Sequence, residues 1–202
     1  KRSDGYIGTL IDDLVTKGTN EPYRMMTSRS EYRLLHRQDN ADIRLSETGL
    51  RIGLVSKERH EEVLKKYAAV DAECRRLERT HLPPSGELNA LLRERGTAEV
   101  TTGTSLAELI RRPQLGYAML APFDPERPAL SRAICAEVEI SLRYEGYIKR
   151  QLKQIAEFTR MESRMLPEDI DYDAVTGLRL EAREKLKRIR PASFGQASRI
   201  SG

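Results

Sequence analysis

The stretch SRAICAEVEISLRYEGYIKRQLKQIAEFTRMESRM, residues 131–165, has the pattern that decides the fold. No proline interrupts it, and apolar side chains return along one side at helical spacing. A helix of this length is about 50 Å long at 1.5 Å per residue, so shorter helices can pack along it. The stretch predicts an all-α protein, an irregular helical bundle around one long helix. The apolar positions on that side are Ile134, Val138, Ile148, Leu152 and Ile155.

Shorter helices are predicted on both sides of the long one from capping residues and apolar spacing. Ser56 caps the longest of them, and Ser28 with Glu31 fits a capping box for a helix through Arg37. Residues 100–102 could equally form a brief strand. The predicted shorter helices are 6–16, 28–37, 41–52, 56–81, 86–95, 104–112, 114–120, 180–189 and 193–200.

Proline, glycine and composition changes divide the chain into three expected parts. Residues 1–55 are expected to join a domain that is absent from this chain. Residues 56–165 form a helical domain that contains the long helix, and residues 166–202 form a small, truncated C-terminal helical subdomain. The chain begins with Lys1 rather than Met and stops within what reads as an unfinished motif at Gly202, so we expect a fragment.

Composition narrows the class of protein. The 202 residues are 33% charged and have a mean hydropathy of −0.59, which argues against a membrane-spanning chain. Two cysteines, Cys74 and Cys135, are too few for a disulfide framework and lack C-x-x-C spacing. We therefore expect a cytoplasmic protein without a membrane partner.

The short motifs that often mark catalytic and metal-binding sites in enzymes are absent from the sequence. The sequence has no G-x-G-x-x-G, no Walker-type loop and no Cys/His group at metal spacing. His60 lies on the apolar stripe of its predicted helix, where a packed histidine is more common than a catalytic one. We expect no catalytic, cofactor-binding or metal-binding residue in this chain.

The basic charge of the sequence is concentrated near its C-terminal end. Residues 179–202 have seven basic and two acidic side chains, a net +5, whereas the whole chain is +4. Lys187, Arg188 and Arg190 are therefore candidate contacts to a polyanion. The alternative is a solvated helix with an accidental excess of arginine.

A second basic segment, residues 21–37, interleaves arginine with tyrosine. If 28–37 is helical, its arginines line one face, where guanidinium groups could bind phosphates bidentately. Tyrosine rings could stack on unpaired bases, which favours RNA over duplex DNA. The alternative is that these arginines pair with Glu21, Glu31 and Asp39 and hold a domain junction together. The candidate RNA-binding residues of this segment are Arg24, Arg29, Arg33, Arg37 and Tyr32.

Three blocks of the sequence occur in an order typical of one protein family. They are YIGTLIDDLV (6–15) with EPYRMMTSRSEYRLL (21–35) and RQDNAD (37–42), YEGYI (144–148) with Gln151, and LE (180–181) with RPASFGQASRISG (190–202). These blocks resemble the MnmG (GidA) family, the flavoprotein subunit of the tRNA uridine 5-carboxymethylaminomethyl modification enzyme. The resemblance spans nearly the whole chain and is loose only over residues 73–132. Met26 and Ser30 stand where the family pattern has Phe and Ala.

The resemblance implies a C-terminal fragment that binds tRNA and the MnmE-type GTPase partner, within an enzyme that works as a homodimer. It implies that FAD and NADH bind to an N-terminal domain absent from this chain. Arg24 and Arg33 fall on motif arginines of the family, whereas Arg29 and Arg37 are candidates from spacing alone. The candidate residues for binding the GTPase are Phe194, Arg199 and Ile200.

An alternative makes the chain a protein–protein interaction scaffold for dimer and GTPase assembly. In that reading the apolar side of the long helix buries interhelical surface, and the last helices dock the GTPase without direct contact to tRNA.

Overall fold

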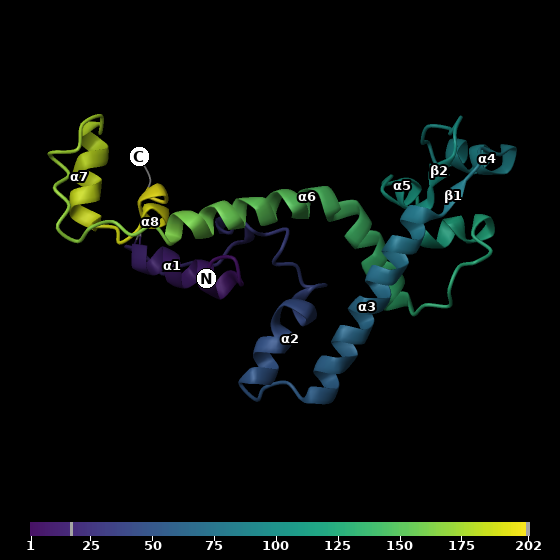
Figure 1. Ribbon diagram of the computed structural model, residues 1–202, viewed down its shortest axis with the longest axis horizontal. Coiled ribbons are helices and arrows are strands. Elements are labelled where there is room, and N and C mark those ends of the chain that lie inside the picture. Colours follow the sequence, from purple (N-terminus) through teal and green to yellow (C-terminus); the bar gives the residue numbers. More distant parts are fainter. Residues whose placement is uncertain (17, 201–202) are drawn as a thin grey trace. The chain divides into compact units, whose positions relative to one another are not determined.

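The computed structural model describes residues 1–16 and 18–200 and confirms the all-α prediction. The predicted long helix is present as α6, Arg132–Glu162, with 31 residues (Figure 1). The chain divides into two compact units, to both of which α6 contributes residues. We call Gln38–Tyr147 the central unit, and Lys1–Arg37 with Ile148–Gly202 the terminal unit. The domain boundaries expected at residues 55 and 165 stay a prediction.

The central unit begins with two helices whose caps were visible in the sequence. In α3 the Ser56 side chain accepts a hydrogen bond from the Arg59 backbone N–H, as the capping residue predicted. The helix α2 ends before Gly53, which has a positive φ of 77° that glycine adopts without strain. The elements of this unit, besides the start of α6, are α2 (Ala41–Arg51), α3 (Lys57–Arg79), β1 (His81–Leu82), α4 (Gly86–Glu94), β2 (Thr104–Ser105), α5 (Leu106–Ile110) and the 3₁₀ helix η2 (Tyr117–Phe123).

The core of the central unit is made by leucine-rich faces of its helices. The apolar stripe predicted on α3 is buried at Val63, Val70 and Leu77. Around it pack fully buried side chains of α4 and α5, and α6 adds Val138 and Leu142 from its first half. Burial of this kind contributes about 25 cal/mol per Å² of apolar surface, so the core holds these short elements in place.

The strand considered at residues 100–102 is absent, and a shorter ladder forms nearby. The strands β1 and β2 are antiparallel, with His81 opposite Ser105 and Leu82 opposite Thr104. The backbone of Val100 is instead held by the Asn89 side chain, which accepts from the Val100 N–H at 2.9 Å and donates to its carbonyl at 3.1 Å. A side chain thus satisfies polar groups that a strand partner would otherwise bind.

A buried ionic network lies beside this core. The Arg76 guanidinium donates to both carboxylate oxygens of Glu73, at 2.8 and 2.9 Å, and also binds Asp124. The Tyr117 hydroxyl donates to Glu73 at 2.8 Å. Burial and this hydrogen bond raise the pKa of Tyr117 to about 12. Both carboxylates are almost fully buried, so Arg76 supplies the charge that makes their burial tolerable.

The terminal unit contains helices from both ends of the chain. The helix α1 reverses the usual pattern in which apolar side chains are buried and polar ones are exposed. Thr9 and Asp13 are buried, whereas Ile7 and Ile11 are exposed. None of the helices in the described ranges combines the length and the apolar composition needed to cross a bilayer. The elements of this unit, besides the end of α6, are α1 (Tyr6–Thr16), the 3₁₀ helix η1 (Thr27–Arg29), α7 (Leu180–Ile189) and α8 (Phe194–Ser198).

The helix predicted over residues 28–37 is wrong. Only the three-residue η1 forms, and Ser30 then takes an extended conformation that ends it. Glu31, which was expected to complete a capping box with Ser28, binds Arg2 instead. The long-range ion pair overrides the local capping pattern, so the arginines of this segment do not share one helical face.

Candidate nucleic-acid interface

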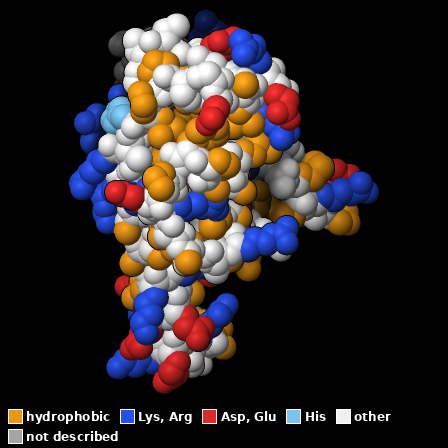
Figure 2. Space-filling model, turned by 90° about the vertical axis from the view of Figure 1, so that its right-hand side faces the viewer, with side chains coloured by type: hydrophobic (Ala, Val, Ile, Leu, Met, Phe, Trp, Pro, Cys, Tyr) orange, Lys and Arg blue, Asp and Glu red, His pale blue; other side chains and the backbone are white. Residues whose placement is uncertain are grey.

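Positive charge is concentrated in the terminal unit. Its residues include 19 basic and 13 acidic side chains, a net +6, whereas the central unit has 16 basic and 18 acidic ones, a net −2. On the face that Figure 2 presents, which is the side of α4 and α5, basic and acidic side chains are interspersed around hydrophobic ones. A polyanion is therefore attracted to the terminal unit rather than to the whole surface.

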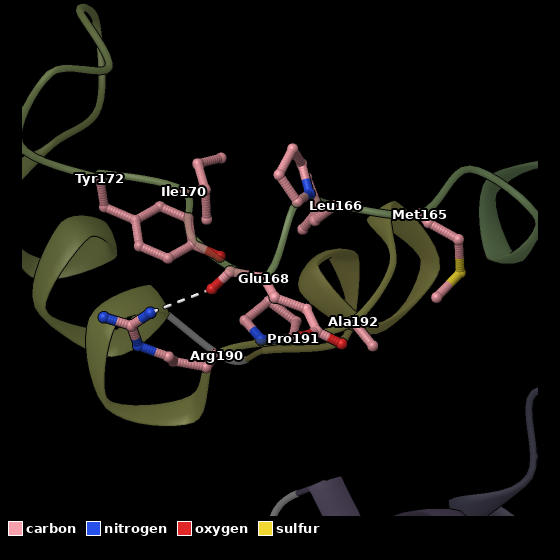
Figure 3. Close-up of a pocket in the computed structure, with 9 residues that line it drawn as sticks. Met165, Leu166, Glu168, Ile170, Tyr172, Arg190, Pro191 and Ala192 are labelled. Atoms are coloured by element: carbon pink, nitrogen blue, oxygen red, sulfur yellow. Dashed lines mark hydrogen bonds between the residues drawn. The ribbon is translucent and has the colours of Figure 1, made fainter.

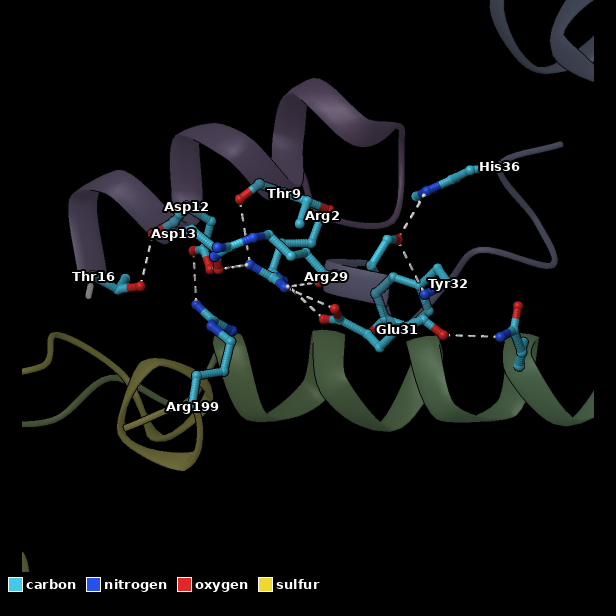
Figure 4. Close-up of polar contacts among 12 residues, drawn as sticks. Arg2, Thr9, Asp12, Asp13, Thr16, Arg29, Glu31, Tyr32, His36 and Arg199 are labelled. Atoms are coloured by element: carbon cyan, nitrogen blue, oxygen red, sulfur yellow. Dashed lines mark hydrogen bonds and ion pairs between the residues drawn. The ribbon is translucent and has the colours of Figure 1, made fainter. Parts of the chain in front are cut away.

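Segment 21–37, which we call the arginine segment, is anchored by Arg2. The Arg2 guanidinium donates to both Glu31 carboxylate oxygens, at 2.8 and 2.7 Å, and to Asp13 at 2.8 Å (Figure 4). The hydrogen bonds to Glu31 and Asp13 raise the pKa of Arg2 above its already high ordinary value. Arg2 therefore stays charged, and its fork geometry fixes the start of the segment to α1. The sequence reasoning missed Arg2, and no local motif marks it.

Further contacts hold the two ends of the arginine segment. The Tyr23 hydroxyl donates to Asp13 at 2.7 Å, and the Arg29 guanidinium lies 4.7 Å from the centre of the Tyr23 ring. At the other end, His36 Nε2 lies 2.9 Å from the Ser3 carbonyl oxygen, which assigns the ring proton to Nε2. The segment is thus attached by side chains rather than by regular secondary structure.

Tyr32 lies inside this arrangement and not on its surface. The side chain is only 4% exposed, and burial raises the pKa of its hydroxyl. Its ring meets that of His36 edge to face, with centroids 6.4 Å apart. The ring is therefore not available for stacking on a base in this structure, and its role here is to pack the segment.

The four arginines of the segment differ in how they are held. Arg37 donates to the Leu34 carbonyl oxygen at 2.7 Å, and Arg29 is occupied by the Tyr23 ring. Arg24 and Arg33 are exposed, and neither has a hydrogen bond or ion pair to another described residue. Arg2 binds Glu31, so the arginines of the segment do not neutralise that carboxylate. The alternative in which they pair with Glu21 or Asp39 stays a prediction. Arg24 and Arg33 are the two arginines of the segment whose guanidinium groups have no described partner.

The basic residues near the C-terminus lie close to an acidic segment. This segment precedes residue 179, so the net charge of +5 for residues 179–202 does not include it. Lys187 forms an ion pair with Asp173, and Arg190 donates to the Glu168 carbonyl oxygen at 3.2 Å. Counted from residue 167, the C-terminal end has seven basic and six acidic side chains, a net +1. Of the three candidates there, Arg188 alone is exposed without a described partner. The local excess is therefore smaller than the sequence count indicated.

A cavity of about 470 Å³ lies beside Arg190 (Figure 3). Arg190 adopts a left-handed backbone conformation with φ 46°, which costs free energy in a residue other than glycine. The following Pro191 is buried and cannot continue α7. The residues that line the cavity are Met165, Leu166, Pro167, Glu168, Ile170, Tyr172, Arg190, Pro191 and Ala192.

The three residues expected to bind a protein partner differ in their exposure and in their contacts. Phe194 is 43% exposed, with the Arg164 guanidinium 4.7 Å from its ring centre. The Arg199 side chain is only 10% exposed and forms ion pairs with Asp12, at 3.0 Å, and with Glu162. Ile200 is half-buried. Arg199 therefore ties α8 to α1 and α6, and Phe194 is the one of the three that presents a large surface.

Comparisons with known proteins place this arrangement in the class of C-terminal helical regions of tRNA-modifying enzymes. Residues 57–152 match the family described as "tRNA modifying enzyme MnmG/GidA C-terminal helical domain". Residues 154–202 match the "tRNA modifying enzyme MnmG/GidA C-terminal helical bundle". The chain belongs to the MnmG/GidA family.

Individual relatives agree with this assignment. The tRNA uridine 5-carboxymethylaminomethyl modification enzyme MnmG of Caldicellulosiruptor saccharolyticus is 57% identical over 201 residues, and that of Geobacillus kaustophilus is 50% identical. GidA of Aquifex aeolicus, in its form II crystal, is 37% identical and superimposes on the whole chain with a TM-score of 0.75. The chain covers 32% of each of these two enzymes and 31% of the GidA chain, about a third of their lengths.

Proposed function

We propose that this chain is the tRNA-binding and partner-binding part of a wobble-uridine modification enzyme of the MnmG type. In this proposal the terminal unit binds the phosphate backbone of tRNA, and α7 and α8 dock the MnmE-type GTPase. The enzyme acts in the cytoplasm as a homodimer, and the redox chemistry takes place on parts of the polypeptide that this chain does not include.

The observation that carries the proposal is the pair Arg24 and Arg33. Both guanidinium groups are exposed without a described acidic partner, on a segment that Arg2 anchors to α1. A guanidinium in this situation can bind a phosphate without first breaking an internal ion pair. The net +6 of the terminal unit adds long-range attraction for a polyanion.

The residues present do not fit the flavin and NADH that the family implies. A dinucleotide phosphate is usually bound where a strand leads through a glycine-rich turn into a helix. In the described chain β1 runs into Pro83 and Pro84 before α4, and β2 runs directly into α5. We therefore propose that these cofactors bind to a part of the polypeptide outside this chain.

A titration with labelled tRNA at two salt concentrations tests the proposal. Binding should weaken steeply with salt, because phosphate contacts release counterions. In the full polypeptide, Arg24→Ala with Arg33→Ala should weaken binding and lower the level of modified nucleoside. Arg93→Ala with Arg95→Ala, two exposed arginines of the central unit, is the matched control. Affinity independent of salt, or equal losses in both double variants, would contradict the proposal.

The scaffold alternative is favoured by the exposed apolar side chains of the last helices. Phe194 is 43% and Leu180 is 70% exposed, which suits a protein contact better than a phosphate contact. A pull-down of the GTPase in the absence of RNA separates the two functions. Retained GTPase binding by a polypeptide that shows no shift of tRNA would favour the scaffold.

A further inference from the structure

Arg199, which directly follows α8, is connected to the arginine segment through a shared carboxylate. Its guanidinium donates to Asp12 Oδ1 at 3.0 Å, and Arg2 donates to the other oxygen of that carboxylate, Asp12 Oδ2, at 3.0 Å. Arg2 in turn binds both carboxylate oxygens of Glu31 (Figure 4). A continuous chain of charge-assisted hydrogen bonds therefore runs from the end of α8 to the arginine segment.

Local packing holds Arg199 where it can make this contact. The Ser193 side chain caps α8 by accepting a hydrogen bond from the Gln196 N–H at 3.2 Å. Gly195 lets the helix approach α6 closely, because a Cβ at this position would lie 2.8 Å from Glu162 Cγ. Arg199 also forms an ion pair with Glu162 itself. The Arg199 side chain is only 10% exposed, so it presents little surface to a partner protein.

The Asp12 carboxylate depends on both arginines. Among the described residues, Arg2 and Arg199 are the two cations within ion-pair distance of Asp12, whose side chain is only 21% exposed. All three nitrogens of the Arg2 guanidinium already donate, one of them to Asp13. Without Arg199, the Asp12 carboxylate would be balanced by Arg2 alone and would compete with Glu31 for it. Loss of Arg199 should therefore loosen the attachment of the arginine segment.

Arg199 also acts on the arginine segment through its charge. Burial alone would raise the pKa of Glu31, but the hydrogen bond from Arg2 and the charges of Arg2 and Arg199 hold it below its usual range. Arg199 thus helps to keep Glu31 ionised and bound to Arg2. The segment keeps other contacts, such as that of Gln151 Nε2 with the Glu31 carbonyl oxygen at 2.9 Å, so we expect it to be loosened rather than released.

We propose that Arg199 is a positioning residue for the tRNA site. It contacts no phosphate, but through Asp12 and Arg2 it holds the arginine segment in place. Arg24 and Arg33 are thereby kept in the conformation that meets the phosphate. A segment that is already ordered loses less conformational entropy on binding, so the affinity depends on a residue that never touches the ligand. This inference rests on the proposed function, since it takes the arginine segment as the tRNA site.

The test uses Arg199→Met in the full polypeptide, titrated with cognate tRNA over a range of salt concentrations. We expect the affinity to fall about tenfold, a coupling usual within one ionic network. The slope of log affinity against log salt should stay unchanged, because no phosphate contact is lost. Arg24→Ala with Arg33→Ala should instead reduce that slope by about 2, roughly one for each contact. Arg79→Met, an exposed arginine of the central unit without a described ion pair, is the charge-matched control and should leave the affinity nearly unchanged.

Further variants separate positioning from a direct contact. Asp12→Asn added to Arg199→Met removes the carboxylate that would compete for Arg2, so it should restore most of the lost affinity. Arg199→Lys keeps a positive charge beside Asp12 and should lose less affinity than Arg199→Met. Hydrogen exchange of the backbone amides of residues 29–36 measures the attachment without tRNA, and it should be faster in Arg199→Met than in the wild type. If far-UV circular dichroism shows that Arg199→Met does not fold, Arg199→Gln replaces it with the same expectations.

An unchanged tRNA affinity in folded Arg199→Met would overturn the inference, even if GTPase binding were lost. So would a salt slope reduced by about 1, which would make Arg199 a phosphate contact. A double variant with Asp12→Asn that binds no better than Arg199→Met would also overturn it. If Arg24→Ala with Arg33→Ala left the affinity unchanged, the proposed function would fail, whereas faster exchange in Arg199→Met would still show that Arg199 holds the segment.

Discussion

Replacing Arg76 by methionine should destabilise the central unit strongly. The side chain binds two carboxylates, Glu73 through two hydrogen bonds and Asp124 through two more. Methionine fills a similar volume but leaves both carboxylates buried without a cation. In this variant the Tyr117 hydroxyl still donates a hydrogen bond to Glu73. Asp124 therefore loses more of its stabilising contacts than Glu73 does. The effect is therefore on the balance of buried charge and not on packing.

The expected magnitude follows from the burial of the three groups. Breaking a buried ion pair by removing one partner costs about 3 to 5 kcal/mol. Arg76 is 25% exposed, so water can reach part of the vacated site, and we expect the low end, about 3 kcal/mol. For a chain of this size this corresponds to a decrease in melting temperature of about 6 to 12 °C.

Differential scanning calorimetry on the wild-type and variant chains measures this change. Hydrogen exchange of the α4 and α5 backbone reports whether the loss lies in the central unit, which matters because two units need not unfold together. Arg79→Met is the matched control on the same helix, since Arg79 is exposed and has no described ion pair. It should change the free energy of unfolding by less than about 0.5 kcal/mol.

A charge-free triple variant separates the electrostatic cause from lost packing. Glu73→Gln with Arg76→Met and Asp124→Asn removes the uncompensated carboxylates, so it should be more stable than Arg76→Met alone. If Arg76→Met lay within about 1 kcal/mol of the wild type, or if the triple variant were less stable than Arg76→Met, uncompensated buried charge would not be the cause of the destabilisation.

Two further predictions concern the same unit. Asn89→Ala removes both hydrogen bonds to the Val100 backbone and should cost about 2 kcal/mol in urea unfolding, whereas a loss below 0.5 kcal/mol would mean that water replaces the amide. The pKa of Tyr117 is raised to about 12, so above pH 10 the unfolded chain releases a proton that the folded protein retains, and stability falls with pH. Tyr117→Phe should lose less stability than the wild type between pH 9 and 11, and parallel urea midpoints over that range would contradict this assignment.

Elements with strong local signals were predictable from the sequence. The long apolar period of α6, the Ser56 cap of α3 and the Gly53 stop after α2 each reflect interactions within a few residues of chain. Such signals are sufficient because helix geometry and capping are local. The all-α class followed from them directly.

The arginine segment shows where local reasoning failed. Ser28 and Glu31 have the spacing of a capping box, but Glu31 binds Arg2, which lies 29 residues away in the sequence. Tyr32 was expected to meet a base, and its ring is buried against His36. For Glu31 a partner distant in sequence determined the outcome, and no pattern within the segment identifies it. The Tyr32 ring packs against a histidine only four residues away, but its burial depends on the fold around the segment.

The candidate interface needed both kinds of information. The amino-acid sequence by itself determined the helical class, the family resemblance and the presence of a basic segment, because composition, period and motif are properties of neighbouring residues. Only the tertiary structure decided which cations are free, since ion pairs such as Lys187 with Asp173 and Arg199 with Asp12 join residues far apart along the chain. The sequence gives the charge of each side chain. Whether that charge can bind a ligand depends on the groups that lie beside it in the folded protein.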